Sequence, residues 1–205
     1  TKEEDFIENL FIANTHDYIL CFTNKGRLFW LKVYEVPQGS RAARGKPIVN
    51  LLKVEEGERI NAILPVKAFT ENEYVFMATA FGTVKKTPLS EFSRPRSNGI
   101  IAINLDEGDH LVGVAITDGQ HDVMLFSDEG KANRFEEQDV RPMGRTARGV
   151  RGMKLGAGAQ VISLLVAENE QQFVLTATEN GYGKRTVITE YTRHGRGGQG
   201  MIAIQ

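Results

Sequence analysis

The sequence predicts an all-β protein in which four-stranded antiparallel units follow one another in a propeller-like arrangement. Three features carry this prediction. A turn glycine recurs about every fifty residues, a second glycine follows each one at a nearly constant offset, and short apolar runs of period two fill the intervals. No stretch shows the sustained 3.6-residue periodicity of an amphipathic helix.

The two sets of glycines define the repeat. The turn glycines are separated by 56, 48 and 51 residues, and the second glycines follow them after 19, 17, 19 and 19 residues. In order, the two sets are Gly26, Gly82, Gly130 and Gly181, and Gly45, Gly99, Gly149 and Gly200. The turn sequences "NKG", "DEG" and "ENG" are typical of β-hairpins, because glycine supplies the positive φ that such turns require.

Each complete repeat is expected to contain four strands. Two apolar runs flank the turn glycine. A third follows the second glycine, as "PIVNLL", "IIAINL", "VRGMKL" and "MIAIQ", and a fourth follows a further turn, as "INAILPV", "LVGVAIT" and "VISLLVA". The single domain 1–205 therefore divides into repeats at 15–66, 67–117 and 118–167 and a partial repeat at 168–205.

The two ends of this scheme are incomplete. Residues 1–14 contain "FIENLFIAN", which predicts the fourth strand of a preceding blade, and the last repeat stops after its third strand. Either these pieces complete one another, or the chain is an open arc with two unpaired edges.

Positive charge is concentrated in corresponding places of the four repeats. The windows 38–46, 84–98, 141–154 and 184–198 hold 3, 4, 5 and 4 Lys or Arg, which is 16 of the 25 in the chain, against two acids. Equivalent loops of a repeat protein emerge on equivalent faces. A chain of net charge −1 is therefore expected to carry a positive stripe along one rim, suited to a curved polyanion such as double-stranded DNA.

Fourteen basic residues of these windows are the predicted phosphate contacts. They are Arg41, Arg44, Lys46, Lys85, Lys86, Arg94, Arg96, Arg145, Arg148, Arg151, Lys184, Arg185, Arg193 and Arg196. The alternative is that the windows are solvated loops of a scaffold propeller, or that they bind an acidic protein partner.

No residue pattern indicates a catalytic, cofactor-binding or metal-binding site. "GSRAARGK" misses the P-loop spacing, and "GRGGQG" precedes a predicted strand rather than a phosphate-binding helix. The four histidines lack metal-ligand spacing, and the one cysteine, Cys21, predicts a reducing compartment, the cytoplasm. No apolar run is long enough for a membrane span, and the acidic first residues, without Met, indicate a piece of a longer chain rather than a signal peptide.

Several long runs resemble the C-terminal domain of the A subunit of bacterial DNA gyrase. They are "EDFIENLFIANTHDYILCF", "ARGKPIVNLL", "ERINAILPV", "VFMATAFGTVKKT", "GVRGMKL" and "TATENGYGKRT", and the resemblance covers essentially the whole chain. It implies a β-pinwheel, a ring of about six blades that exchange strands, of which this chain is an open arc. It also implies a basic perimeter that wraps DNA without sequence preference.

The resemblance further implies a place in a larger enzyme. That enzyme is a type IIA topoisomerase with two A and two B subunits near the nucleoid, which uses ATP and Mg bound elsewhere to add negative supercoils. The family's heptapeptide Gln-Arg-Arg-Gly-Gly-Lys-Gly is missing, and "HGRGGQG" is only a degenerate echo, so weaker DNA binding is expected. The alternative relative is the tail of the topoisomerase IV A subunit.

Overall fold

The computed structural model describes residues 11–45, 47–177 and 180–203, which form strands, one-turn helices and loops. The strands are β1 (Tyr18–Thr23), β2 (Arg27–Lys32), β3 (Ile60–Val66), β4 (Tyr74–Thr79), β5 (Thr83–Pro88), β6 (Ile100–Ile101), β7 (Leu111–Thr117), β8 (Asp122–Ser127), β9 (Lys131–Glu136), β10 (Val150–Arg151), β11 (Val161–Ala167), β12 (Phe173–Ala177), β13 (Gly183–Val187) and β14 (Met201–Ile202). The 3-10 turns are η1 (Val33–Glu35), η2 (Ile48–Leu51), η3 (Leu89–Phe92), η4 (Glu137–Asp139) and η5 (Ile188–Glu190).

The strands form three four-stranded antiparallel sheets, as the sequence predicts, and one hairpin in place of the three-stranded unit predicted for the partial fourth repeat. Their orders are β3-β1-β2-β6, β7-β4-β5-β10, β11-β8-β9-β14 and β12-β13, and we call them blades 1 to 4. The outermost strand of each complete blade comes from the next repeat along the chain. This is the strand exchange that the family resemblance implies, and it links each repeat to its predecessor.

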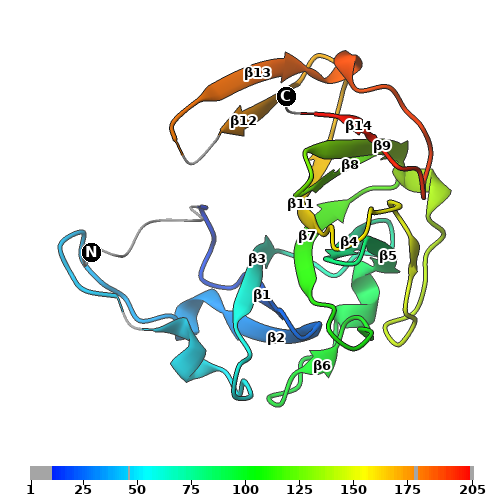
Figure 1. Cartoon of the computed structure of the whole chain (residues 1–205). Coiled ribbons are helices and arrows are strands. Elements are labelled where there is room, and N and C mark those ends of the chain that lie inside the picture. The colour runs from blue at the N-terminus through cyan, green and yellow to red at the C-terminus, as the bar shows by residue number, and fades with distance from the viewer. Residues whose placement is uncertain (1–10, 46, 178–179, 204–205) are drawn as a thin grey trace.

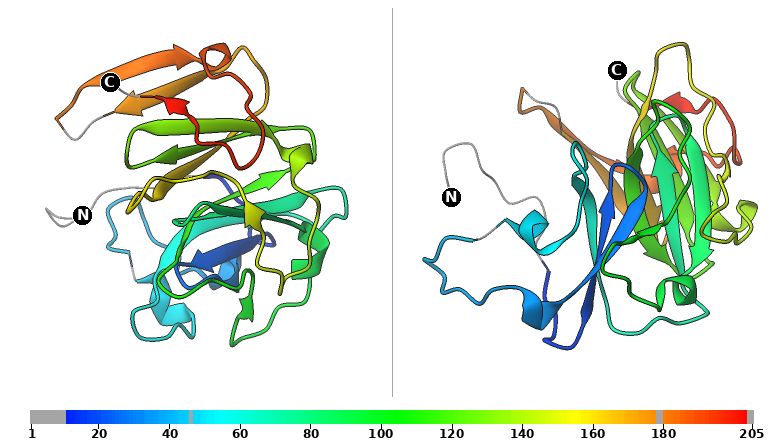
Figure 2. Two further views of the ribbon diagram at one scale, coloured as in Figure 1. Left: turned by 45° about the vertical axis from the view of Figure 1, so that its right-hand side comes forward. Right: turned by 90° about the horizontal axis from the view of Figure 1, so that it is seen from below.

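The blades follow one another around an open arc (Figure 1). The innermost strands β3, β7 and β11 lie side by side, with β7 in contact with both of the others. A gap separates the β12–β13 hairpin from blade 1 in Figure 1, and Figure 2 shows the blades stacked one upon another when the arc is turned.

Apolar side chains fill the junctions between blades. Leu20 and Phe22 of blade 1 pack against Val75 and Met77 of blade 2, and the second and third junctions repeat this pattern. The central strands β1, β4 and β8 of blades 1 to 3 each lie between two packed layers, so both of their faces are largely buried. This explains why the strand sequences are nearly continuous apolar runs.

The two glycine sets mark the two sides of each strand exchange. The carbonyl oxygen of the turn glycine Gly82 accepts a hydrogen bond from Gly152 N at 2.8 Å, directly after the borrowed strand β10. Gly26 and Gly130 accept from Ala102 N and Ala203 N at 2.8 Å in the same way. The second glycine of repeats 2 to 4 therefore directly precedes a strand that is lent to the turn of the preceding repeat.

Two predicted strands are corrected. "PIVNLL" forms the 3-10 turn η2 instead of a strand, since the described residues include no preceding blade whose hairpin it could join. Its Ile48 and the following Leu52 instead cover Ile19 and Cys21 on the outer face of blade 1. Of "FIENLFIAN", residues 11–14 form no strand, and residues 6–10 lie outside the described residues.

Candidate nucleic-acid interface

Three loops run along the outer edge of the arc, each from the 3-10 turn of one blade to the outermost strand of the preceding blade (Figure 1). We call the segments 93–99, 140–154 and 191–200 the rim. They follow the second, third and fourth hairpins, and the strand exchange brings them to the perimeter. The strand exchange therefore explains why these three basic windows lie along one edge of the arc.

Neighbouring segments of the rim are joined by hydrogen bonds. Gly197 N donates to Gly152 O and Lys154 N donates to Gly198 O, both at 2.8 Å. Arg196 Nη1 donates to the carbonyl oxygen of Arg151 at 2.9 Å. The third and fourth basic windows thus form one continuous surface rather than separate mobile loops.

Most predicted phosphate contacts on the rim have accessible guanidinium groups. The exposed ones are Arg94, Arg96, Arg148, Arg151, Arg193 and Arg196, and Arg145 is half-buried. Arg148 pairs with Asp106 and Arg193 with Asp122, each at 2.7 Å. For Arg94, Arg96 and Arg151, the described part of the chain supplies no carboxylate within ion-pair distance.

A concave surface lies where the first two rim segments meet. Arg94, Arg96 and Arg145 line it together with the hydroxyl residues Ser90 and Ser93. Its other lining residues are Glu71, Glu91 and Ile100. Three guanidinium groups and two hydroxyl groups can donate hydrogen bonds to a phosphate group, which makes this surface a candidate anion site on the rim.

The structure corrects the sequence interpretation of the two lysines of the second hairpin, which were predicted as phosphate contacts. Lys85 is fully buried, and its Nζ donates to the carbonyl oxygens of Ala102, at 2.8 Å, and Arg145. Lys86 is buried too, and its Nζ donates to Glu137 O at 3.2 Å. Both side chains hold blades together and neither can reach a phosphate group, so we remove them from the proposed contacts.

Burial also changes the acidity of these lysines. Desolvation, together with the positive charge of Arg145, lowers the pKa of Lys85 to about 8. Desolvation lowers the pKa of Lys86 as well, against the opposing effect of the nearby Glu137 carboxylate. Lys85 and Lys86 are therefore structural residues rather than part of a surface stripe.

The remaining predicted contacts lie away from the rim. Arg41 and Arg44 are exposed in the loop of blade 1 that lies at one end of the arc. Lys184 and Arg185 are exposed on β13 at the other end, where the guanidinium carbon of Arg185 lies 4.7 Å from the ring centre of Phe173. Lys46 falls outside the described residues.

The predicted contacts omit two exposed basic residues of the rim, Arg141 and Lys154. Both belong to the window 141–154, so the same charge count could have included them. They extend the positive surface at the two ends of the second rim segment.

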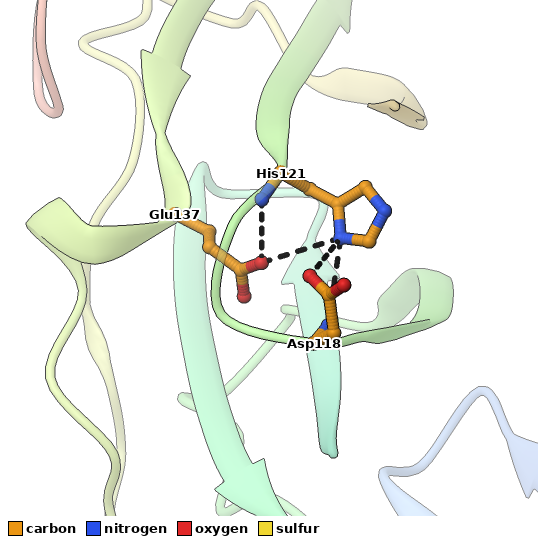
Figure 3. Close-up of side chains that lie close together, drawn as sticks. All are labelled: Asp118, His121 and Glu137. Carbon is orange, nitrogen blue, oxygen red and sulfur yellow. Dashed lines mark hydrogen bonds and ion pairs between the residues drawn. The ribbon is translucent and has the colours of Figure 1, made fainter. Parts of the chain in front are cut away.

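One cluster of potential metal ligands was not predicted. His121 Nδ1 lies 2.9 Å from Asp118 Oδ1 and 3.4 Å from Glu137 Oε1 (Figure 3). His121 N also donates to Glu137 Oε1 at 2.9 Å, and the ammonium group of Lys86 lies 3.8 Å from Glu137 Oε2. The ammonium group of Lys86 already supplies a positive charge beside this cluster. Hydrogen bonds explain the short distances between His121, Asp118 and Glu137.

The same position of other repeats supports a structural role for this cluster. Nine residues before the turn glycine, where repeat 3 has His121, repeat 1 has Asp17 and repeat 4 has Gln172. Asp17 Oδ2 accepts from Asn14 N at 2.9 Å, and Gln172 Oε1 accepts from Glu168 N at 2.7 Å. These side chains close the turn that enters each blade, and we assign no metal to the cluster.

The comparisons with known proteins agree with this fold. A family model described as the DNA gyrase C-terminal domain, β-propeller, matches residues 17–67, 73–118, 121–168 and 172–205. The A subunit of DNA gyrase from Klebsiella oxytoca is 62% identical over 204 residues, covering 100% of this chain. The chain spans 23% of the length of that relative.

Two solved structures are also similar. The C-terminal domain of a DNA topoisomerase IV is 32% identical with a TM-score of 0.85, covering 93% of this chain and 59% of that one. A DNA gyrase A C-terminal domain is 30% identical with a TM-score of 0.78, covering 92% of this chain and 60% of that one.

In the described ranges no helix has the length and apolar character needed to cross a membrane. The repeats, the exchanged strands and the match over nearly every residue show that this chain belongs to the DNA gyrase C-terminal domain family.

Proposed function

We propose that this chain binds double-stranded DNA without sequence preference and bends it around the rim. The observation that carries the proposal is the continuous rim, on which Arg94, Arg96 and Arg151 have no carboxylate partner among the described residues. Each phosphate group neutralised by such a side chain releases counterions, so affinity comes from charge rather than from base contacts. A curved track of contacts can offset the cost of bending DNA, about 1–6 kcal/mol for 20–30 base pairs.

The proposal extends to the intact protein. The module would be part of the A subunit of an A2B2 DNA gyrase in the cytoplasm, and would present wrapped DNA to a catalytic core. Strand passage would use ATP and Mg bound elsewhere in that enzyme, and the rim residues would contribute binding and curvature only. The identity of 62% to the A subunit of a DNA gyrase supports this assignment.

Topoisomerase IV is the second candidate, because its domain has the higher TM-score, 0.85 against 0.78. The supercoiling activity of the intact enzyme distinguishes the two. Introduction of negative supercoils into relaxed plasmid supports the gyrase assignment, and ATP-dependent relaxation without supercoiling supports topoisomerase IV.

Ligation of nicked circular DNA with bound protein tests the wrapping itself. A linking number that rises with protein concentration supports a wrap of positive sign. Tight DNA binding with an unchanged linking number would contradict wrapping, and no duplex binding at low salt would favour a protein partner for the rim.

A further inference from the structure

A hydrogen-bond donor occupies the same position in each of the three blade junctions, four residues after the turn glycine. Trp30 Nε1 donates to Phe92 O at 2.8 Å, and Lys86 Nζ donates to Glu137 O at 3.2 Å. Arg134 Nη1 donates to Ile188 O at 3.1 Å and to Tyr191 O at 3.0 Å. In every case the acceptor is a carbonyl in, or directly after, the 3-10 turn of the next blade. We call this contact the inter-blade clamp.

Arg185 is the fourth member of this series, four residues after Gly181. It pairs across the hairpin with Leu175, as Lys86 pairs with Phe76 and Arg134 with Met124. Phe76 and Met124 are 0% exposed because the next blade covers them, whereas Leu175 is 79% exposed. Phe173, on the same face, is 53% exposed.

The Arg185 side chain is already in the position that the clamp requires. Its guanidinium carbon lies 4.7 Å from the ring centre of Phe173, as Lys86 Nζ lies 4.8 Å from that of Tyr74. Tyr74 and Phe173 are both eight residues before their turn glycines. The donor of blade 4 thus lies over an aromatic ring at the same position as the donor of blade 2. Among the described residues, however, Arg185 has no hydrogen-bond acceptor in the place of the next blade.

Lys184 belongs to a second series, three residues after the turn glycine. Its equivalent Lys85 donates to Ala102 O and Arg145 O, and the equivalent Asn133 donates to Gly152 O at 2.9 Å and Gly195 O at 3.1 Å. In both cases one acceptor follows a borrowed strand and the other lies in the rim segment that crosses over it. Lys184 can donate both of these hydrogen bonds only when a further rim segment crosses blade 4.

We propose that Arg185 and Lys184 are clamp residues that hold a further blade of the same repeat, and that they are not phosphate contacts. Arg185 would donate to the 3-10 turn of that blade, and its apolar face would cover Leu175 and Phe173. DNA fits this face poorly, because a phosphate backbone offers no apolar surface for the two side chains. This inference is independent of whether the rim binds DNA.

We assign the covering blade to the same polypeptide in the intact protein. The chain covers only 59% and 60% of the two solved domains that it matches, so those domains contain further residues. The three junctions described above also join consecutive repeats of one chain. A second copy of the chain would instead make the contact depend on protein concentration.

Amine labelling of the intact protein, read by mass spectrometry, tests this assignment. Lys85 and Lys86 serve as buried references, and Lys154 serves as the exposed reference. We expect Lys184 to react about tenfold or more slowly than Lys154, in the absence of DNA and at every protein concentration. Reaction as fast as Lys154, or slowing that depends on protein concentration, would overturn the proposal.

Adding DNA separates this inference from the proposed function. Protection of Lys184 that appears only with DNA would make it a phosphate contact and overturn the clamp. The DNA response of Lys154, by contrast, reports on the rim alone. Its failure to become protected would count against DNA binding by the rim while leaving the clamp intact.

A pair of variants of the intact protein gives a second test. Arg185→Met is expected to lower the unfolding midpoint and to leave the salt dependence of DNA binding unchanged. The matched variant Arg94→Met is expected to do the reverse, because Arg94 is exposed on the rim. An Arg185→Met protein with an unchanged midpoint and a reduced salt dependence would refute the clamp.

Discussion

Lys85 Nζ donates to the carbonyl oxygen of Ala102 across 2.8 Å, so a buried ammonium group on blade 2 binds the segment that follows the strand lent to blade 1. On blade 3 the neutral amide of Asn133 makes the corresponding bond to Gly152 O at 2.9 Å. The bond itself therefore needs a donor rather than a charge. Because the charge is buried without a carboxylate, it makes the stability of the domain depend on pH.

The first prediction concerns this pH dependence. The folded-state pKa of Lys85 is about 8, below the value of about 10.4 for a free lysine, so between these values the unfolded chain binds more protons. Lys85 should then contribute a rise in the free energy of unfolding of about 1 kcal/mol from pH 8 to pH 9. The Cys21 thiol opposes this rise in the same interval, because burial raises its pKa to about 12 and only the unfolded chain ionises it there.

Denaturant unfolding at pH 7, 8 and 9 measures the effect. Lys85→Gln keeps a donor and removes the charge, so the slope of the free energy of unfolding against pH should become smaller by the contribution of Lys85. Lys154→Gln is the control, since Lys154 is exposed, and it should retain the slope of the unchanged protein. Equal slopes for Lys85→Gln and the unchanged protein would show that Lys85 is not the titrating group.

The second prediction compares two Arg–Asp pairs of equal length. Arg134 and Asp122 are buried and lie 2.7 Å apart, and Arg148 and Asp106 are exposed at the same distance. Arg134→Met should cost about 3–5 kcal/mol in the free energy of unfolding, because it leaves a buried carboxylate and two carbonyl groups short of a donor. Arg148→Met should cost no more than about 1 kcal/mol.

Urea or thermal unfolding of both variants decides the matter. The ratio between the two losses is the informative quantity, since the chemical change is identical. Similar losses would mean that Arg193, which also lies 2.7 Å from Asp122, compensates for the missing Arg134.

The third prediction concerns the rim. The double variant Arg94→Gln/Arg96→Gln removes two of the three arginines around the concave surface. The slope of log affinity for duplex DNA against log salt should become shallower by about 0.9 for each phosphate group that the rim no longer neutralises, with no change in base preference. Fluorescence anisotropy over a salt series measures the slope.

The control for this prediction is Arg59→Gln. Arg59 is also exposed but lies directly before the innermost strand β3, away from the rim. Its replacement should leave the slope unchanged. Equal losses for Arg59→Gln and the double variant would indicate a response to net charge alone.

The periodic glycines and the basic windows were sufficient to predict the blades and the surface that carries most of the rim arginines. For Lys85 and Lys86 that reasoning was wrong, because it predicted exposed side chains. Adjacent residues of a strand point to opposite faces, and a strand between two blades has no free face, so both amines are buried. The sequence shows a charge but not the backbone carbonyls that receive it.

The exchange of strands between repeats was the second feature that the sequence alone could not predict. The run "PIVNLL" has the composition of its three equivalents, yet it forms η2, because strand formation there depends on a hairpin from another repeat. Whether an apolar run becomes a strand is thus decided by its partner. The same dependence explains why Leu175 is exposed although its sequence matches that of buried positions.

The last prediction concerns the turn glycine Gly82, which has a φ of +89° and receives the segment after β10. A Cβ atom at this position would lie 2.6 Å from Met153 O, a backbone atom that cannot move without separating the borrowed strand from its turn. Gly158 has a φ of +74° and no atom within 4 Å of the equivalent Cβ, so it is a matched control for the backbone strain alone. Gly158→Ala should cost about 1–2 kcal/mol in the free energy of unfolding, the cost of a left-handed conformation. Gly82→Ala should cost clearly more, since the collision adds to that strain, and it should also raise the hydrogen-exchange rate of the Gly152 amide. Equal losses of stability in the two variants would show that the exchanged strand tolerates displacement, and that the turn glycine is required only for its φ.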